Sequence, residues 1–248
     1  MLADNKIWKN YVDKKYEKKH PLPVVEIDEL FPAFSESVGI FAFLDGGSLP
    51  TDIGILQAIS KRFKDCKYFE IGTWRGESVV NVADYAAECY TLNLSRMELI
   101  ASGEDEKYAD LHGFFSKQKK NIVHLEGNSL TYDFSKLNKK FDLVFIDGDH
   151  RYEFVKNDTE KIFNHLIHDN SIVVWHDYGY DPVNIRYEVL AGILDGIPSQ
   201  FRDKLYQVSN TLCAIFTREK LNSKKFVSPV IPNKEFKLNI EVRRIMGI

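Results

Sequence analysis

The sequence predicts an α/β fold with a doubly wound, mostly parallel sheet, and three observations support this prediction. Short apolar segments alternate five times with segments of helical character between residues 51 and 195. Two of the short segments, 141–147 and 171–177, are almost continuously apolar, as strands are when helices cover both faces of a parallel sheet. The segment 205–216, with Ser209-Asn210 at its centre, predicts a two-stranded antiparallel end. In such a sheet, ligands bind at the carboxyl ends of the strands.

Composition excludes several classes of protein. The chain has 248 residues, of which 44% are hydrophobic and 13% aromatic, so it is not mainly disordered. Its net charge of -3 gives no overall attraction to nucleic acid or to an acidic membrane. The cysteines, Cys66, Cys89 and Cys213, are too few and too widely spaced for a disulfide framework or a zinc site. No apolar segment resembles a secretory signal or a membrane helix, so we expect a cytoplasmic protein with no membrane partner.

Residues 1–50 are expected to form an N-terminal helical and loop extension. The first 22 residues are rich in lysine and contain Trp8, Tyr11 and Tyr16. They suit either a basic patch for an anionic partner or a solvated helix whose aromatic side chains dock on the main domain. We favour docking, because the positive charge is local and the overall balance is acidic.

The regular pattern begins at Thr51, which is expected to cap a helix with one apolar face. Ser95 and Glu98 have capping-box spacing and predict a helix start within the polar segment 95–120. The other predicted elements are strands at 67–71, 89–93 and 122–125, and helices near Gly76, at 154–168 and at 183–195. The predicted apolar face of the first helix consists of Ile55, Leu56, Ile59 and Phe63.

The first strand is followed by two glycines, Gly72 and Gly76, in the run EIGTWRGES (70–78). Glycines let the backbone turn tightly and approach a ligand, and the next helix presents free amide groups. A dinucleotide site requires G-x-G-x-x-G, which is absent here. The spacing here is G-x-x-x-G, with Glu70 two residues before the first glycine. This combination suits a ligand that has an amino acid end and a ribose but no pyrophosphate. The structural alternative is a turn that needs small residues.

Two later strand ends carry neutral polar residues suited to a nucleoside. Asn93 ends the second strand, where nucleoside-binding α/β proteins often place an acid for the ribose hydroxyls. Asn128 and Ser129 follow the third strand and suit an adenine edge, although a plain turn explains them equally well.

The fourth and fifth strands end in acidic residues and histidines. Asp147 and His150 follow the fourth strand, and His176 and Asp177 follow the fifth. Oxygen-rich sets of this kind suit Mg²⁺ or Mn²⁺, and histidine is the usual general base near neutral pH. Singly, each residue has a structural explanation, as a helix cap or a satisfied polar group. Together, at neighbouring strand ends, they indicate a functional site.

These motifs resemble class I S-adenosylmethionine-dependent methyltransferases. The resemblance covers about residues 51–217 and is closest to the small-molecule branch with the motif IDGDH-x-Y, which includes relatives named for cephalosporin hydroxylase and macrocin O-methylation. It rests on EIGTWRGES, GNS (127–129), FDLVFIDGDHRYEFVKND (141–158) and SIVVWHDY (171–178).

The resemblance implies a Rossmann-like sheet of seven strands, the last antiparallel. It implies that S-adenosylmethionine is held by Glu70, Gly72, Thr73, Gly76, Ser78, Asn93, Asn128, Ser129 and Asp147. In metal-dependent relatives the ligands correspond to Asp147, His176 and Asp177, with a histidine here in place of an acid. Two versions stay open: these residues hold a divalent cation, or His150 or His176 acts as the base without one.

The leading hypothesis is methyl transfer to a small-molecule acceptor, through an oxygen nucleophile. One alternative is an NAD-dependent oxidoreductase, which the missing third glycine disfavours. The other is a nucleic-acid methyltransferase, disfavoured by the acidic balance and the absence of an N-P-P-Y or D-P-P-Y motif. The catalytic domain is expected at 51–217, with a C-terminal extension at 218–248; whether identical chains associate is left open.

Overall fold

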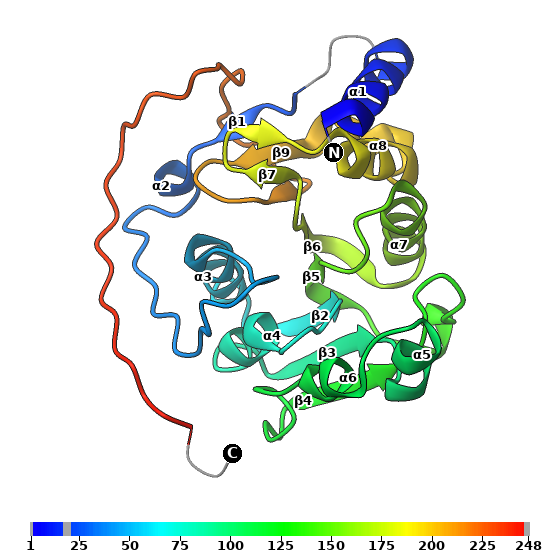
Figure 1. The fold of residues 1–248 in the computed structure, drawn as a ribbon. Helices are drawn as coiled ribbons and strands as arrows, with labels where there is room; N and C mark the ends of the chain where they lie inside the picture. Colours follow the sequence, from blue (N-terminus) through cyan, green and yellow to red (C-terminus); the bar gives the residue numbers. More distant parts are fainter. Residues whose placement is uncertain (1, 17–20, 246–248) are drawn as a thin grey trace.

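The computed structural model describes residues 2–16 and 21–245, and its centre is one mixed sheet with helices on both faces (Figure 1). The strand order is β1-β9-β10-β6-β5-β2-β3-β4. The order reverses between β2 and β5, where successive crossovers leave in opposite directions. The strands are β1 (Val24–Val25), β2 (Lys67–Ile71), β3 (Glu88–Asn93), β4 (Ile122–Glu126), β5 (Phe141–Ile146), β6 (Ile167–Trp175), β9 (Leu205–Val208) and β10 (Ala214–Phe216).

The predicted α/β class is confirmed, but the predicted count of seven strands is wrong. The central strands are parallel, and β10 runs antiparallel to both of its neighbours, as the segment 205–216 predicts. The eighth strand is β1, which pairs parallel to β9 with Val24 opposite Gln207. A two-residue strand is too short to show any periodicity in the sequence. A separate small pair, β7 (Gly179–Asp181) and β8 (Asn184–Ile185), follows β6.

The helices begin and end close to the predicted positions, with two corrections in the first predicted helix. Thr51 does not cap its helix: Leu49 is the N-cap, and the Thr51 hydroxyl donates to the Asn210 carbonyl (2.8 Å). Phe63 lies beyond the helix end, whereas the capping box of Ser95 and Glu98 is confirmed. The helices are α1 (Leu2–Tyr16), α2 (Ile27–Leu30), α3 (Pro50–Ser60), α4 (Glu77–Val82), α5 (Arg96–Ala101), α6 (Glu106–Leu111), α7 (Tyr152–His165) and α8 (Tyr187–Gly196), with 3₁₀ turns at Phe134–Leu137 and Ser199–Lys204.

The central strands contribute side chains to two hydrophobic cores, one on each face of the sheet. Alternate residues of a strand point to opposite faces, so in β5 Val144 and Phe145 belong to different cores. One core packs strand residues against α7 and α8, and the other packs them against α3 and α4. Burial on both faces explains why these strands read as continuous apolar runs.

Helix α1 docks on the main domain through aromatic side chains and one buried carboxylate. Trp8 stacks on Tyr152 with ring centroids 4.8 Å apart. The Asp195 carboxylate accepts from the hydroxyls of Tyr11 (2.5 Å), Tyr152 (2.7 Å) and Tyr16, and pairs with Lys15. The expectation of a docked helix is confirmed for the described part of the lysine-rich segment; residues 17–20 lie outside it.

Beyond the sheet, the chain runs extended along the outside of the molecule to residue 245 (Figure 1, orange to red). Lys224 pairs with Val24 through backbone hydrogen bonds, and Lys234 forms an ion pair with Glu26. Within the described residues, no helix combines the length and hydrophobicity that a membrane span requires.

Candidate active site

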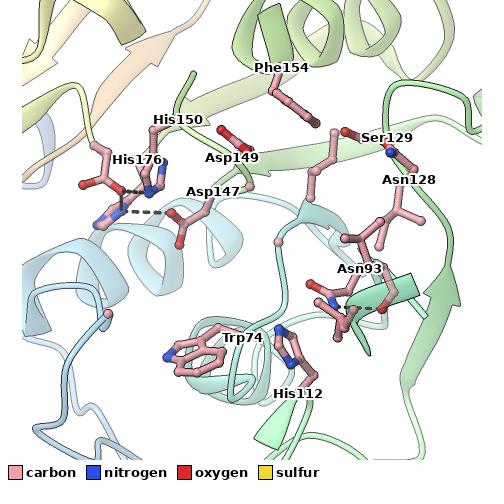
Figure 2. Close-up of a pocket in the computed structure, with 18 of the residues that line it drawn as sticks. Trp74, Asn93, His112, Asn128, Ser129, Asp147, Asp149, His150, Phe154 and His176 are labelled. Carbon is pink, nitrogen blue, oxygen red and sulfur yellow. Dashed lines mark hydrogen bonds and ion pairs between the residues drawn. The ribbon is translucent and has the colours of Figure 1, made fainter. Parts of the chain in front are cut away.

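A cavity of about 830 Å³ opens at the carboxyl ends of the parallel strands, where the strand order reverses between β2 and β5. This is the position expected for a ligand site in a doubly wound sheet. Figure 2 shows side chains from several strand ends converging on it. The predicted residues that line the cavity are Gly72, Asn93, Asn128, Ser129, Asp147, His150, His176 and Asp177.

Four predicted cofactor residues, Glu70, Thr73, Gly76 and Ser78, lie behind the cavity wall rather than in it. The Glu70 carboxyl is fully buried and accepts hydrogen bonds from the hydroxyls of Tyr68 (2.7 Å), Ser78 (2.9 Å) and Thr91 (2.8 Å). Burial raises the pKa of Glu70 to about 8, despite these hydrogen bonds. The geometry gives Glu70 and Ser78 a supporting part: they tie β2, β3 and α4 together beneath the loop that borders the cavity.

The two glycines of the first loop allow close approaches within the protein. A Cβ on Gly72 would lie 1.9 Å from the Asp147 carbonyl oxygen, and a Cβ on Gly76 would lie 2.3 Å from the Ser116 hydroxyl oxygen. Both glycines have positive φ, of 95° and 82°. Gly72 therefore lets β2 and β5 end side by side, which brings Asp147 to the cavity.

The nucleoside side of the cavity carries Asn93, Asn128 and Ser129. The Asn93 Oδ1 accepts from the Thr73 amide (3.4 Å), and its Nδ2 donates to the Leu94 carbonyl (3.0 Å). The Asn128 carboxamide accepts from the Leu130 amide (2.9 Å), which fixes the turn after β4. All three residues line the cavity at or just after the ends of β3 and β4.

On the opposite side, acidic residues surround His176 (Figure 2). His176 Nδ1 lies 3.0 Å from an oxygen of Asp147 and 3.0 Å from an oxygen of Asp177. His150 Nε2 lies 3.2 Å from Asp177 Oδ2, and Arg186 approaches the other Asp177 oxygen at 3.9 Å. The structure therefore brings together all four residues predicted from the ends of β5 and β6.

Asp52, which sequence reasoning missed, completes this group. Its carboxylate is fully buried and lies 3.0 Å from His176 Nε2. It also accepts from the backbone amides of Leu49 (2.7 Å) and Leu212 (2.8 Å). Its place in the first turn of α3 was predictable, but its contact with a histidine 124 positions away has no signal in the sequence.

The surrounding carboxylates determine the protonation of His176. Burial alone would lower the pKa of His176, but the charge of Asp147 and hydrogen bonds with Asp147, Asp177 and Asp52 raise that pKa well above its ordinary value. Burial would also raise the pKa of Asp177, but the hydrogen bond with His176 lowers it. Burial raises the pKa of Asp147. The three carboxylates around His176 thus favour its protonated form.

The same donors fit a divalent cation. Within the described part of the chain, Asp147, His150 and Asp177 each offer a ligand atom, and these atoms lie within 4.8 Å of one another. His176 Nδ1 is a further nitrogen donor in contact with both carboxylates. Carboxylate oxygens with imidazole nitrogen suit Mn²⁺ and related ions, and an Asp52 carboxylate on the far ring nitrogen is the usual support for a metal-bound histidine.

An aromatic wall, also missed from the sequence, borders the cavity at the loop after β2 and at α6. Trp74, Tyr108 and His112 contact one another, with 4.6 Å between the ring centroids of Trp74 and Tyr108. The indole Nε1 of Trp74 is buried and has no hydrogen-bond partner in the described structure. Phe154 lines the cavity near Ser129 (Figure 2). Aromatic residues at irregular positions in loops give no pattern from which this wall follows.

Residues 69–178 match a family model described as a methyltransferase domain. This region contains the strand-end residues from β2 to β6 that line the cavity. The match supports the expectation that this chain is a methyltransferase. Among curated proteins, none matches the chain.

Among the solved structures similar to this chain are three methyltransferases. The methyltransferase PaMTH1 of Podospora anserina, bound to SAH, is 18% identical, with 70% of this chain and 80% of that chain covered and a TM-score of 0.48. The O-methyltransferase TomG of Streptomyces achromogenes, in complex with SAM, is 14% identical, with coverage of 69% and 81% and a TM-score of 0.45. The TDP-rhamnose 3'-O-methyltransferase CalS11 is 16% identical, with coverage of 68% and 78% and a TM-score of 0.45.

Proposed function

We propose that this protein transfers the methyl group of S-adenosylmethionine to an oxygen of a small-molecule acceptor. One observation carries the proposal: a single cavity joins a neutral polar side, at Asn93 and Asn128, to an acidic and histidine-rich side, at Asp147 and His176. The first side suits the adenosine of the cofactor, and the second suits an acceptor hydroxyl. Gly72 lies between them, where the methionine end would approach the backbone.

The chain contributes alignment above all, because the methyl carbon of the sulfonium is already activated. Holding the nucleophile, the carbon and the leaving sulfur in line supplies roughly 7–11 kcal/mol of barrier reduction. The turn fixed by Asn128, at the edge of the parallel strands, is suited to this task. Water exclusion falls to the aromatic wall formed by Trp74, Tyr108 and His112.

We propose that Asp147, Asp177 and a histidine of the cluster hold a Mg²⁺ or Mn²⁺ ion. When bound, such an ion lowers the pKa of an acceptor hydroxyl and orients it toward the methyl group. His176 would be the histidine ligand through Nδ1, with Asp52 fixing its ring through Nε2. His150, which contacts only Asp177 in this group, is then the better candidate for the proton acceptor.

Cofactor choice is tested by ligand-induced stabilisation. S-adenosylhomocysteine at about 100 times its dissociation constant should raise the unfolding free energy by roughly 2.7 kcal/mol. NAD at the same concentration should leave it unchanged, because the first loop lacks the pyrophosphate glycine. An equal shift with both ligands would contradict the proposal.

The cation is tested by titrating the protein with Mn²⁺ in a calorimeter. Asp177→Asn should weaken Mn²⁺ binding by at least about tenfold, because it removes one charged ligand. Asp169→Asn is the matched control, since the Asp169 side chain is 98% exposed and lies outside the cavity. Equal Mn²⁺ affinities in the wild type and Asp177→Asn would exclude Asp177 as a ligand.

A cytoplasmic location stays a prediction.

A further inference from the structure

The exposed C-terminal segment, residues 235–245, has the residue pattern of a strand without a partner. Apolar and polar residues alternate strictly from Phe236 to Arg243. Alternation with period two is the pattern of a β-strand that has one apolar face. The exposed fractions of the four apolar side chains are 41% for Phe236, 66% for Leu238, 72% for Ile240 and 95% for Val242.

Nothing in the described chain covers this segment. Lys234 is the last residue held to the body, through its ion pair with Glu26, and every residue from 235 to 245 is exposed. The backbone is extended and carries no ladder of hydrogen bonds to another strand. A run of exposed apolar side chains on extended backbone marks an interaction surface.

The segment is complementary to a second copy of itself. When two copies run antiparallel with Asn239 opposite Asn239, Lys237 of each lies opposite Glu241 of the other. The same register sets Glu235 opposite Arg243, so both charged pairs have opposite signs. The apolar residues also meet: Leu238 lies opposite Ile240, and Phe236 lies opposite Val242.

The pairs divide correctly between the two faces of the resulting ribbon. Residues directly opposite in an antiparallel pair lie on the same face, where opposite charges and apolar pairs both stabilise the sheet. The four apolar residues of each copy therefore share one face, and the charged residues and Asn239 share the other. The arrangement has a two-fold axis through Asn239, as an isologous dimer requires.

We propose that residues 235–243 are a dimerisation arm, which pairs antiparallel with the same segment of a second copy of this chain. The pairing is independent of the proposed methyl transfer, because no residue of the arm lines the cavity.

Sedimentation velocity of the full chain over a series of concentrations tests the proposal through charge reversal. The wild type should show a concentration-dependent dimer. Lys237→Glu should raise its dissociation constant by about tenfold or more, because two symmetric attractive pairs become repulsive. Adding Glu241→Lys to this variant should restore the wild-type constant. Lys220→Glu, an equal charge change on an exposed lysine outside the arm, should have no effect.

Each alternative occupant of the arm predicts a different result. A wild type that is monomeric at every concentration would overturn the proposal, including one that instead binds vesicles of anionic lipid. A dimer that Lys237→Glu leaves intact would show that the copies meet elsewhere. A dimer that Lys237→Glu weakens and that the added Glu241→Lys does not restore would refute this register. Pairing of the arm with the free edge of β4 would give that result.

Discussion

Replacing Gly72 by alanine should destabilise the protein through a clash inside the sheet rather than through the ligand. The added Cβ would lie 1.9 Å from the Asp147 carbonyl oxygen and 2.5 Å from its carbonyl carbon. Both atoms belong to backbone, which cannot rotate away as a flexible side chain can. The end of β2 or of β5 must therefore move, and Asp147 moves with it.

Gly103 provides a matched control for the conformational part of this cost. Its φ is +102°, close to the +95° of Gly72, yet an added Cβ on Gly103 would have no atom within 4 Å. Gly103→Ala should therefore cost only the left-handed strain, about 1–2 kcal/mol. Gly72→Ala should cost that amount and a further 1–3 kcal/mol or so from overpacking.

Thermal and urea unfolding of both variants, without ligand, measure the difference directly. For a chain of this size, each 1 kcal/mol shifts the melting temperature by about 2–4 °C, so Gly72→Ala should melt roughly 2–12 °C below Gly103→Ala. Equal melting temperatures would refute the reasoning that Gly72 is required by the approach of β5. A loss of S-adenosylhomocysteine binding with unchanged stability would assign the glycine to the ligand instead.

Three further predictions concern the supporting residues. Asp52→Asn should weaken Mn²⁺ binding by about 10–100-fold in calorimetry, because His176 loses the carboxylate that orients it; unchanged affinity would contradict this role. Below pH 4.5 Glu70 is protonated in both the folded and the unfolded protein, but between pH 4.5 and about 8 only the folded protein keeps the proton. The unfolding free energy should therefore fall as pH rises through this range, by at most about 5 kcal/mol. Glu70→Gln should flatten that slope in urea titrations, and an equal slope would show that another group causes it. Trp8→Ala should lower the unfolding free energy by about 1–3 kcal/mol, because stacking on Tyr152 ties α1 to α7; a variant as stable as the wild type would show that α1 docks without it.

The sequence predicted the residues at strand ends well, because local rules determine them. The bounds of β2 match those predicted, since an apolar run that ends at glycine has few alternatives. Asp147 and His176 converge because the carboxyl ends of parallel strands share one edge of the sheet. That geometry follows from fold class alone and needs no knowledge of side-chain packing.

Contacts between distant segments could not be predicted in the same way. The pairing of Asp52 with His176 depends on how α3 packs on the sheet, and many acids in the sequence were equally eligible. The position of Glu70 behind the cavity depends on three hydroxyl donors, two of them on other elements. Residue type and spacing identify chemistry at a strand end, but they do not say which atoms face the ligand.

The cavity wall has a consequence for folding, because its residues come from almost the whole main domain. Asp45 and Gly46 border it at one end of the sequence and Leu212 at the other, with strand ends between. When β2 and β5 separate in a partly unfolded form, this wall is lost. A bound ligand must therefore dissociate before the sheet opens between these two strands. Bound S-adenosylhomocysteine should therefore slow amide hydrogen exchange in β2, β3, β5 and β6 together, even at residues far from the ligand. The arm at 235–243, which has no part in the wall, should exchange at the same rate with and without it.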